Sequence, residues 1–153
     1  DLYVFDTHLL SDIIEQPIEK EWMFISAPKD DLDQLYDKML DFSKQVFLHT
    51  DKETMHRYIN AQNEAIILTT LVSEAPTYKG DDFNSFTLEG ILVNVLYEAD
   101  ILQGSLGIEF TNLFEIAFKK YNVNRSKLIR YASRRDKKAE IKNLLKMMDK
   151  NGK

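Results

Sequence analysis

Residues 2–26 read LYVFDTHLLSDIIEQPIEKEWMFIS and contain two strand patterns on either side of a helix pattern. The first, Leu2–Phe5, is rich in residues that favour β-strands. Thr7–Glu15 then repeats apolar residues at helical spacing, and Pro17 follows as a stop signal. Trp22–Ser26 is a second apolar run of strand length. This strand–helix–strand order predicts an α/β fold.

The same alternation continues to about residue 72. A helix is expected over 31–44, a short strand at Val46–His49 (VFLH), and a fourth, fully apolar strand at Ala65–Thr70 (AIILTT). We therefore expect an α/β half at about 1–72, with a small mixed sheet of about four strands and right-handed crossovers. The sequence leaves open which of these strands are parallel.

The second half changes to helical patterns after a loop at Ser73–Ser85, which contains Pro and Gly. Thr87–Tyr97 is apolar almost all round, which is typical of a buried central helix. Phe110–Tyr121 repeats apolar residues along one helical face and gives the strongest periodic signal in the chain. We expect a helical half at about 86–150. Because no internal repeat or linker interrupts the pattern, residues 1–153 are expected to form a single domain.

Positive charge is concentrated in Tyr121–Lys150, which reads YNVNRSKLIRYASRRDKKAEIKNLLKMMDK. From Lys119 to Lys153 there are 13 Lys or Arg and three acids, a net charge of +10, whereas residues 1–118 carry −15. This segregation predicts an electrostatic dipole whose basic end attracts phosphates or an acidic protein. The alternative is that these cations only solvate the outer face of terminal helices.

The basic stretch is expected to form a helix over 125–134, with Lys127, Arg130 and Arg134 on one face. Tyr131 lies beside this row, where it is either a base-stacking platform or a core aromatic residue. The predicted contact residues for nucleic acid or another partner are Lys127, Arg130, Tyr131, Arg134, Arg135 and Lys138. Such a surface requires that the arginines face solvent and are not locked into internal ion pairs.

Capping residues divide this stretch into two helices. Asn124 is the expected N-cap of the first, and Asp136 is expected to cap the second. In the second helix an apolar stripe alternates with lysines that point to water. The stripe consists of Ile141, Leu144, Leu145 and Met148, and the lysines are Lys138, Lys142 and Lys146.

The sequence contains no recognisable catalytic constellation. It has no Cys, which excludes disulfides and thiolate metal sites, and its three His lack the spacing of a zinc-binding helix. The GSLG run at 104–107 does not match a phosphate-binding loop, and five Gly leave little for backbone phosphate cradles. We therefore expect no catalytic residue, no metal and no cofactor, and a protein that is not an enzyme.

Three acidic features were weighed as sites. The acids at 30–33 (DDLD) lie where a helix begins, so capping is favoured over Mg²⁺ binding. Asp81 and Asp82 follow a Gly and favour a turn. Glu74 follows a buried strand, where sites of α/β proteins often lie, and it is the one acid predicted to be functional.

No apolar run approaches the roughly 18–20 residues of a membrane span, and no signal peptide opens the chain. A cytoplasmic protein that does not enter the membrane is therefore expected. The chain also begins inside a strand-like run, which suggests a longer parent protein.

Several stretches together resemble the bacterial AbiEi-like proteins, which are antitoxins and transcriptional regulators of type IV toxin–antitoxin systems. The resemblance covers nearly the whole chain and includes uncharacterised relatives in Bacteroidetes. Its most specific pieces are SEAP (73–76) and RYASRR (130–135). The stretches are Leu2–Asp6 with Thr7, VFLHTDKE (46–53), IILTTLVSEAPT (66–77), FTLEGILVNVL (86–96), Gln103-Gly104-Ser105, and FEIAFKKYNVNRSKLIRYASRRDKKAEI (114–141).

The resemblance implies a two-part protein, with an N-terminal winged helix-turn-helix that binds DNA and a C-terminal α/β domain like this one. Such an antitoxin opposes a nucleotidyltransferase-like toxin and represses its own promoter. No winged helix precedes Leu2, so DNA binding through that module is expected to belong to the parent. The RYASRR region is carried over as a contact surface.

Three hypotheses follow. The first is a non-enzymatic antitoxin-type effector domain whose basic C-terminal helices contact nucleic acid, the toxin, or the toxin's nucleotide or RNA substrate. The second is a metal-dependent nuclease or nucleotidyltransferase that uses Glu74 with Asp30 or Asp82. The third is the dimerisation domain of a repressor, in which exposed parts of the Phe110–Tyr121 stripe meet a second copy.

Overall fold

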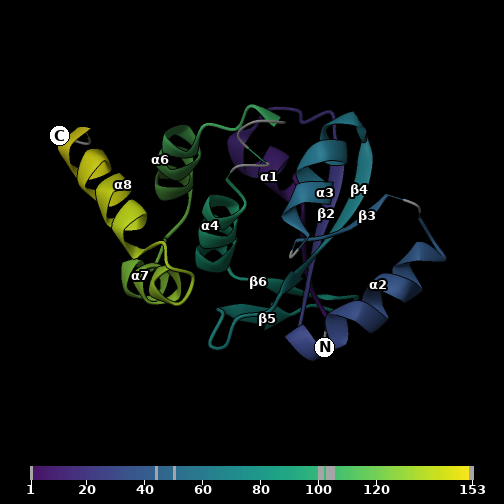
Figure 1. The fold of residues 1–153 in the computed structure, drawn as a ribbon. Coiled ribbons are helices and arrows are strands. Elements are labelled where there is room, and N and C mark those ends of the chain that lie inside the picture. Colours follow the sequence, from purple (N-terminus) through teal and green to yellow (C-terminus); the bar gives the residue numbers. More distant parts are fainter. Residues whose placement is uncertain (1, 44, 50, 100–101, 103–105, 152–153) are drawn as a thin grey trace. The chain divides into compact units, whose positions relative to one another are not determined.

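The computed structural model describes residues 2–43, 45–49, 51–99, 102 and 106–151 (Figure 1). The chain divides into two compact units. Unit 1 consists of Asp1–Val72 and Tyr78–Ser85, and unit 2 consists of Ser73–Thr77 and Phe86–Lys153. The α/β half and the helical half expected from the sequence correspond to these units, except that residues 78–85 belong to unit 1.

A mixed sheet of six strands forms the framework of unit 1, in the order β3-β4-β2-β1-β6-β5. The strands are β1 (Tyr3–Asp6), β2 (Glu21–Ala27), β3 (Val46–Leu48), β4 (Glu64–Thr70), β5 (Thr77–Lys79) and β6 (Asn84–Phe86). The predicted number of about four strands was too low. β5 and β6 fall almost entirely in the predicted loop, and with three residues each they are too short to show the period of two that identifies a strand.

The pairing in the sheet is both parallel and antiparallel. β2 pairs with β4 in parallel over their full length, from Glu21 opposite Glu64 to Ala27 opposite Thr70. β3 is parallel to β4, and β6 is parallel to β1. β1 and β2 are antiparallel, and α1 lies between them in the chain.

The helices of unit 1 begin at residues with clear capping roles. Asp6 ends β1 and caps α1 (Thr7–Ile14), since its carboxylate accepts a hydrogen bond from the Leu9 amide at 3.0 Å. Asp51 caps α3 (Lys52–Tyr58) in the same way. α2 spans Leu32–Leu40 and ends earlier than the predicted residue 44, and short 3-10 turns precede α2 (Lys29–Asp31) and follow α3 (Ile59–Ala61).

Alternate residues of β2 pack into two cores. On one face Ile25 and Ala27 pack with Leu32 and Leu35 of α2 and with Leu68 of β4. Trp22 and Phe24 occupy the alternate positions of β2, so they point to the opposite face, where both are fully buried. Phe24 stacks on Phe5 of β1, with ring centroids 4.8 Å apart.

Unit 2 consists mainly of helices: α4 (Leu88–Tyr97), α6 (Phe110–Lys120), α7 (Arg125–Arg134) and α8 (Lys138–Asn151). Every residue of α4 from Glu89 to Leu96 is buried, which confirms the predicted central helix. α7 packs against α4 and α8, and α6 packs against α8. In the Phe110–Tyr121 stripe Leu113, Phe114 and Ala117 are buried, Phe110 and Phe118 are half-buried and Tyr121 is 45% exposed. The dimer interface of the third hypothesis stays a prediction.

The predicted caps of the basic helices have different outcomes. Asn124 caps α7 as expected, because its side-chain oxygen accepts the Lys127 amide at 3.1 Å. Asp136 does not precede α8 as a cap. It adopts a left-handed conformation (φ 58°) at the end of α7, where its amide binds the Ser133 carbonyl and the Lys137 amide binds that of Ala132. This pattern is a Schellman motif, which closes α7 rather than opening α8.

Gly90 of α4 lets the 73–77 segment approach the helix. A Cβ at this position would lie 2.8 Å from the Pro76 carbonyl oxygen and 2.9 Å from the Phe86 Cβ. The Pro76 carbonyl also accepts a hydrogen bond from the Thr87 amide at 2.9 Å. The backbone of this segment is therefore fixed against the start of α4.

Gly90→Ala is expected to lower the free energy of unfolding by about 1–3 kcal/mol through overpacking. Gly→Ala within a helix ordinarily raises it by about 1 kcal/mol, so the sign of the change reports the close contact. Urea denaturation followed by circular dichroism measures both. Asn143→Ala, at an exposed position of α8, serves as the control and should stabilise slightly. A stabilising Gly90→Ala change would show that the 73–77 segment is not held here.

Within the described residues, no helix combines the length and the apolar character needed to cross a lipid bilayer.

Candidate nucleic-acid interface

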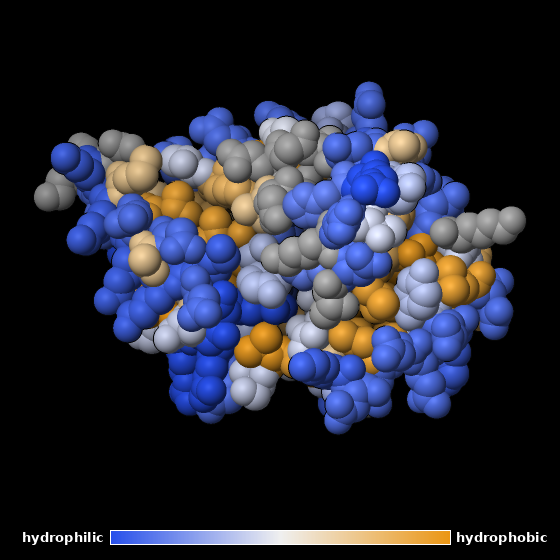
Figure 2. All heavy atoms as spheres, viewed as in Figure 1, coloured by the Kyte–Doolittle hydropathy of each residue, from blue (hydrophilic) through white to orange (hydrophobic). Residues whose placement is uncertain are grey.

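α7 separates apolar and basic residues onto opposite faces. The buried residues share one face of the helix, as their spacing requires. They are Leu128, Tyr131 and Ala132. Lys127, Arg130 and Arg134 are exposed on the other side, as the sequence predicted. Hydrophilic side chains gather over this part of the molecule in the space-filling view, below the position of α7 (Figure 2).

Glu74 and the basic row of α7, which the sequence predicted separately, come together in unit 2. Glu74 Oε1 lies 3.1 Å from Arg130 Nη2, and Glu74 Oε2 forms an ion pair with Arg134 Nη2. The two arginines lie one helical turn apart, so each binds one oxygen of the same carboxylate. The Arg134 hydrogen bond, followed by the charges of Arg134 and Arg130, lowers the pKa of Glu74 below its usual value.

These ion pairs remain open to solvent. The side chain of Arg130 is 73% exposed, that of Arg134 49% and that of Glu74 41%. Arg130 and Arg134 therefore satisfy the requirement that they face solvent, but they do not satisfy the requirement that they be free of internal ion pairs. Solvent screens exposed pairs of this kind, so they contribute little to stability and a competing anion can displace the carboxylate.

A hollow of about 420 Å³ lies beside this ion pair within unit 2. Lys127 and Arg130 contribute its positive charge, and Glu74 is the only acid in its lining. The lining residues are Glu74, Ala75, Pro76, Thr77, Thr87, Lys127, Arg130 and Tyr131. An anion is the complementary ligand for such a surface.

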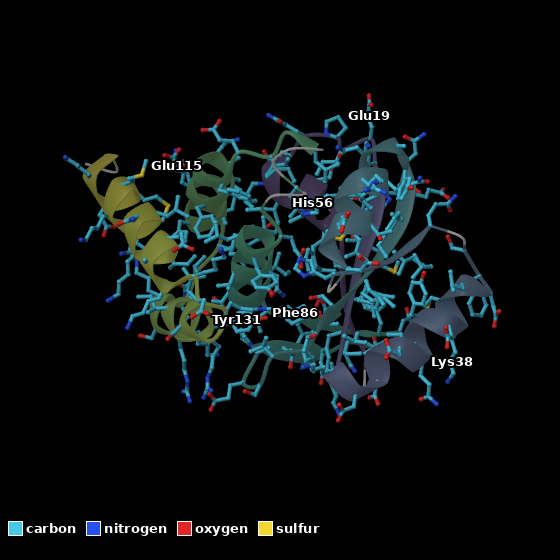
Figure 3. All side chains as sticks on the ribbon, in the orientation of Figure 1. Glu19, Lys38, His56, Phe86, Glu115 and Tyr131 are labelled. Carbon is cyan, nitrogen blue, oxygen red and sulfur yellow. The ribbon has the colours of Figure 1, made fainter. Side chains whose placement is uncertain are left out.

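Tyr131 and Arg135 were predicted as contact residues, but both are buried, with 1% and 6% of their surface exposed. Tyr131 lies on α7 (Figure 3). Its hydroxyl donates a hydrogen bond to Asn94 of α4 at 2.7 Å. The Arg135 guanidinium donates to the Tyr131 hydroxyl at 3.2 Å and lies 4.1 Å from the centre of the Tyr97 ring. Burial raises the pKa of Tyr131 above its usual value. This placement corrects the prediction: both residues join α7 to α4 and neither can contact a partner.

α8 presents the second group of basic residues. Ile141 and Leu145 of the predicted stripe are buried, and Leu144 and Met148 are half-buried. Lys138, Lys142 and Lys146 are exposed at intervals of four residues. α7 and α8 are joined by Arg125, which binds both carboxylate oxygens of Asp149 at 3.0 and 2.7 Å. The hydrogen bonds that Arg125 donates to Asp149 raise the pKa of Arg125.

The family of the chain is shown by a comparison with family models, in which a family of unknown function (DUF6577) matches residues 1–151. The chain belongs to the DUF6577 family. The comparisons with curated proteins and with solved structures found no match. The description of DUF6577 names no activity, so the resemblance to AbiEi-like antitoxins stays a prediction. Its Gln103-Gly104-Ser105 stretch lies outside the described residues.

Among the described residues of this DUF6577 member, no group of three or more acids and histidines is placed to hold a metal ion. Asp31 is the N-cap residue of α2, but its side chain makes no capping hydrogen bond. Its backbone is helical and continues the preceding 3-10 turn. The capping role predicted for this residue is therefore incorrect. Asp81 and Asp82 lie in the turn between β5 and β6, as expected, where the Gly80 amide binds the Phe83 carbonyl at 3.0 Å.

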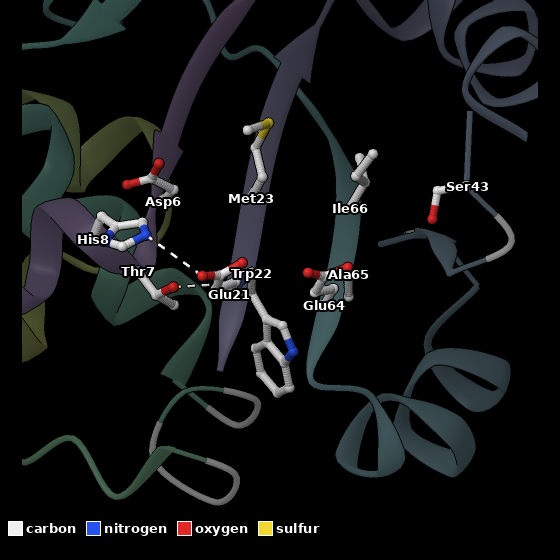
Figure 4. Close-up of a pocket in the computed structure, with 10 residues that line it drawn as sticks. All are labelled: Asp6, Thr7, His8, Glu21, Trp22, Met23, Ser43, Glu64, Ala65 and Ile66. Atoms are coloured by element: carbon white, nitrogen blue, oxygen red, sulfur yellow. Dashed lines mark hydrogen bonds and ion pairs between the residues drawn. The ribbon is translucent and has the colours of Figure 1, made fainter. Parts of the chain in front are cut away.

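A second hollow in this DUF6577 member, of about 280 Å³, lies over the sheet of unit 1 (Figure 4). Glu21 and Glu64 stand at paired positions of β2 and β4, and Met23 and Ile66 lie beside them. His8 Nε2 is 3.8 Å from Glu21 Oε1, and both side chains are more than half exposed. Thr7 is buried in the lining, but its hydroxyl is already engaged, because it donates to the Lys20 carbonyl at 2.6 Å and accepts the Trp22 amide at 3.2 Å. This hollow therefore carries less specific chemistry than the arginine–glutamate cluster.

The two units also differ in net charge. Unit 1 contains seven Lys or Arg and 16 acids, which gives −9, and unit 2 contains 13 Lys or Arg and nine acids, which gives +4. Glu89 and Glu98 of unit 2 are buried, so they are withdrawn from its surface. The net charge of unit 2, +4, is smaller than the +10 of residues 119–153 alone. The positive charge of unit 2 is concentrated on α7 and α8.

Proposed function

We propose that this DUF6577 member is a non-enzymatic effector domain of an AbiEi-like antitoxin and transcriptional regulator, which acts in the cytoplasm and contacts nucleic acid through α7 and α8. The observation that carries the proposal is the set of solvent-facing cations on these two consecutive helices. They are Lys127, Arg130, Arg134, Lys138, Lys142 and Lys146.

The chemistry of these side chains favours phosphates. Guanidinium groups match phosphate oxygens in geometry, and lysine ammonium groups add charge without a fixed direction. The α8 lysines are spaced four residues apart, about 6 Å along the helix axis, close to the spacing of successive phosphates. The surface has no exposed aromatic platform on α7, since Tyr131 is buried, so binding through the backbone rather than through bases is expected.

A cognate nucleotidyltransferase-like toxin is the alternative partner that the resemblance implies. It would meet the same cations with an acidic surface. Both forms of the proposal depend on α7 and α8, and the choice between them rests on whether nucleic acid binds the isolated chain.

The triple change Lys138→Gln, Lys142→Gln and Lys146→Gln is expected to weaken binding of a fluorescein-labelled 20-nucleotide DNA or RNA. We expect at least about a tenfold loss at low salt, and a salt slope smaller by roughly 2–3, because each phosphate contact contributes about 0.7–0.9 to the slope. Fluorescence anisotropy at a series of salt concentrations measures both quantities.

The matched control changes the same charge on unit 1, with Lys29→Gln, Lys38→Gln and Lys79→Gln, all at exposed positions. This control should weaken binding less than twofold. Equal losses in both triple variants would assign the binding to overall charge. Absence of binding by the unmodified chain would contradict the nucleic-acid form of the proposal and leave the toxin as the partner to test.

A further inference from the structure

We propose that Lys127, Arg130 and Arg134 form a binding site for one phosphate group, and that Glu74 occupies this site as an internal competitor. The inference rests on the proposed function and adds to it a defined phosphate position and a residue that weakens binding. Its starting point is the geometry of the ion pair, in which one carboxylate holds the facing Nη2 atoms of two arginines.

The donors that bind a carboxylate also bind a phosphate. Arg130 and Arg134 project from adjacent turns of α7 and direct one Nη2 each at a different oxygen of Glu74. Two oxygens of a phosphodiester can accept from the same pair of guanidinium groups. Lys127, on the same face of α7, lines the adjoining hollow and supplies a third cation for the phosphate.

A fixed backbone holds Glu74 in this position. The Pro76 carbonyl accepts from both the amide and the hydroxyl of Thr87, at 2.9 and 3.3 Å. Glu74 itself has a left-handed conformation, with φ 63°. The two other non-glycine residues with positive φ, among those described, are Glu15 and Asp136, which lie at helix ends. A left-handed conformation is unfavourable for a residue with a Cβ, and the two ion pairs hold Glu74 in it.

A phosphate can displace the Glu74 carboxylate from the two arginines. Glu74 and both arginines are substantially exposed, so an incoming phosphate reaches them without opening the core. The lowered pKa of Glu74 keeps its carboxylate ionised at neutral pH, where it competes continuously. An exposed pair contributes little stability, and a nucleic acid that makes several contacts can therefore replace it.

The test compares Glu74→Gln with Asp149→Asn in the full chain, using the labelled 20-nucleotide probe. Both changes remove one negative charge that pairs with arginine in unit 2, but Asp149 binds Arg125 instead of the proposed site. Glu74→Gln is expected to bind the probe about 3–10-fold more tightly, with a salt slope larger by roughly 1–2. Asp149→Asn should change affinity less than twofold. Adding Arg130→Gln and Arg134→Gln to Glu74→Gln should remove the gain.

Equal gains in both single variants would overturn the inference in favour of a general field effect. Weaker binding by Glu74→Gln would show that Glu74 positions the surface instead of competing for it. If the unmodified chain binds through the α8 lysines but Glu74→Gln gives no gain, only this inference fails. If neither the unmodified chain nor Glu74→Gln binds the probe, both this inference and the proposed nucleic-acid function fail.

Discussion

Arg135→Ala is expected to lower the free energy of unfolding by about 2–4 kcal/mol, because hydrogen bonds to a charged group contribute about 1.5–3 kcal/mol and its removal leaves buried polar partners unsatisfied. The guanidinium donates to the Tyr131 hydroxyl and to the Asn94 side-chain oxygen, and it stacks on the Tyr97 ring. Buried cation–π contacts of this type contribute about 2 kcal/mol or more.

The adjacent Arg134→Ala is the matched control. It removes the same side chain from the same turn of α7, but from an exposed position, so a loss of no more than about 1 kcal/mol is expected. Urea denaturation of both variants gives the comparison. Similar losses for the two variants would contradict the buried position of Arg135.

Two probes show where this destabilisation acts. Trp22 is the only tryptophan and lies in unit 1, so its fluorescence follows that unit, whereas circular dichroism follows helices in both. If Arg135→Ala separates the two transitions, unit 2 unfolds on its own. If they stay coincident, the chain unfolds as one cooperative system.

Trp22→Ala is expected to lower the free energy of unfolding by about 3–5 kcal/mol, the usual cost of truncating a buried tryptophan. The side chain is fully buried, and its indole Nε1 donates to the Gln62 carbonyl at 3.0 Å. Removal therefore leaves both a cavity and an unpaired carbonyl beneath the β2–β4 pair.

Met23→Ala provides the control for Trp22→Ala, since it is the next residue of β2 and points to the opposite face with 38% exposure. A loss of no more than about 1 kcal/mol is expected there, because burial energy scales with the apolar area removed from water. Circular dichroism during urea denaturation measures both variants. A larger loss at Met23 than at Trp22 would contradict the assigned faces of the strand.

Local signals predicted much of the fold. The four longer apolar runs became β1, β2, β3 and β4, and the expected helix over 125–134 was confirmed with its Asn124 cap. These features depend on near neighbours in the chain. β5, β6 and the parallel pairing of β2 with β4 depend on contacts between distant segments, so no short pattern specified them.

The candidate site was predicted only in part, because charge alone does not determine burial. Arg135 was assigned to the basic face, although it follows Leu128, Tyr131 and Ala132 at positions i, i+3, i+4 and i+7. That spacing places it on the buried stripe, and it was the signal that could have identified its role. The link between Glu74 and Arg130 joins residues 56 positions apart, and no periodic pattern reveals it.

The two ends of the sheet affect how copies of this chain meet at high concentration. β3 and β5 occupy these ends, and each is only three residues long. A short terminal strand exposes few unpaired amides and carbonyls, so it is a poor template for strand addition by another molecule. The longest strands, β2 and β4, pair with each other inside the sheet, and their central residues also pair with β1 and β3 on the outer sides. The arrangement protects the most apolar segments of unit 1 against amyloid-like association.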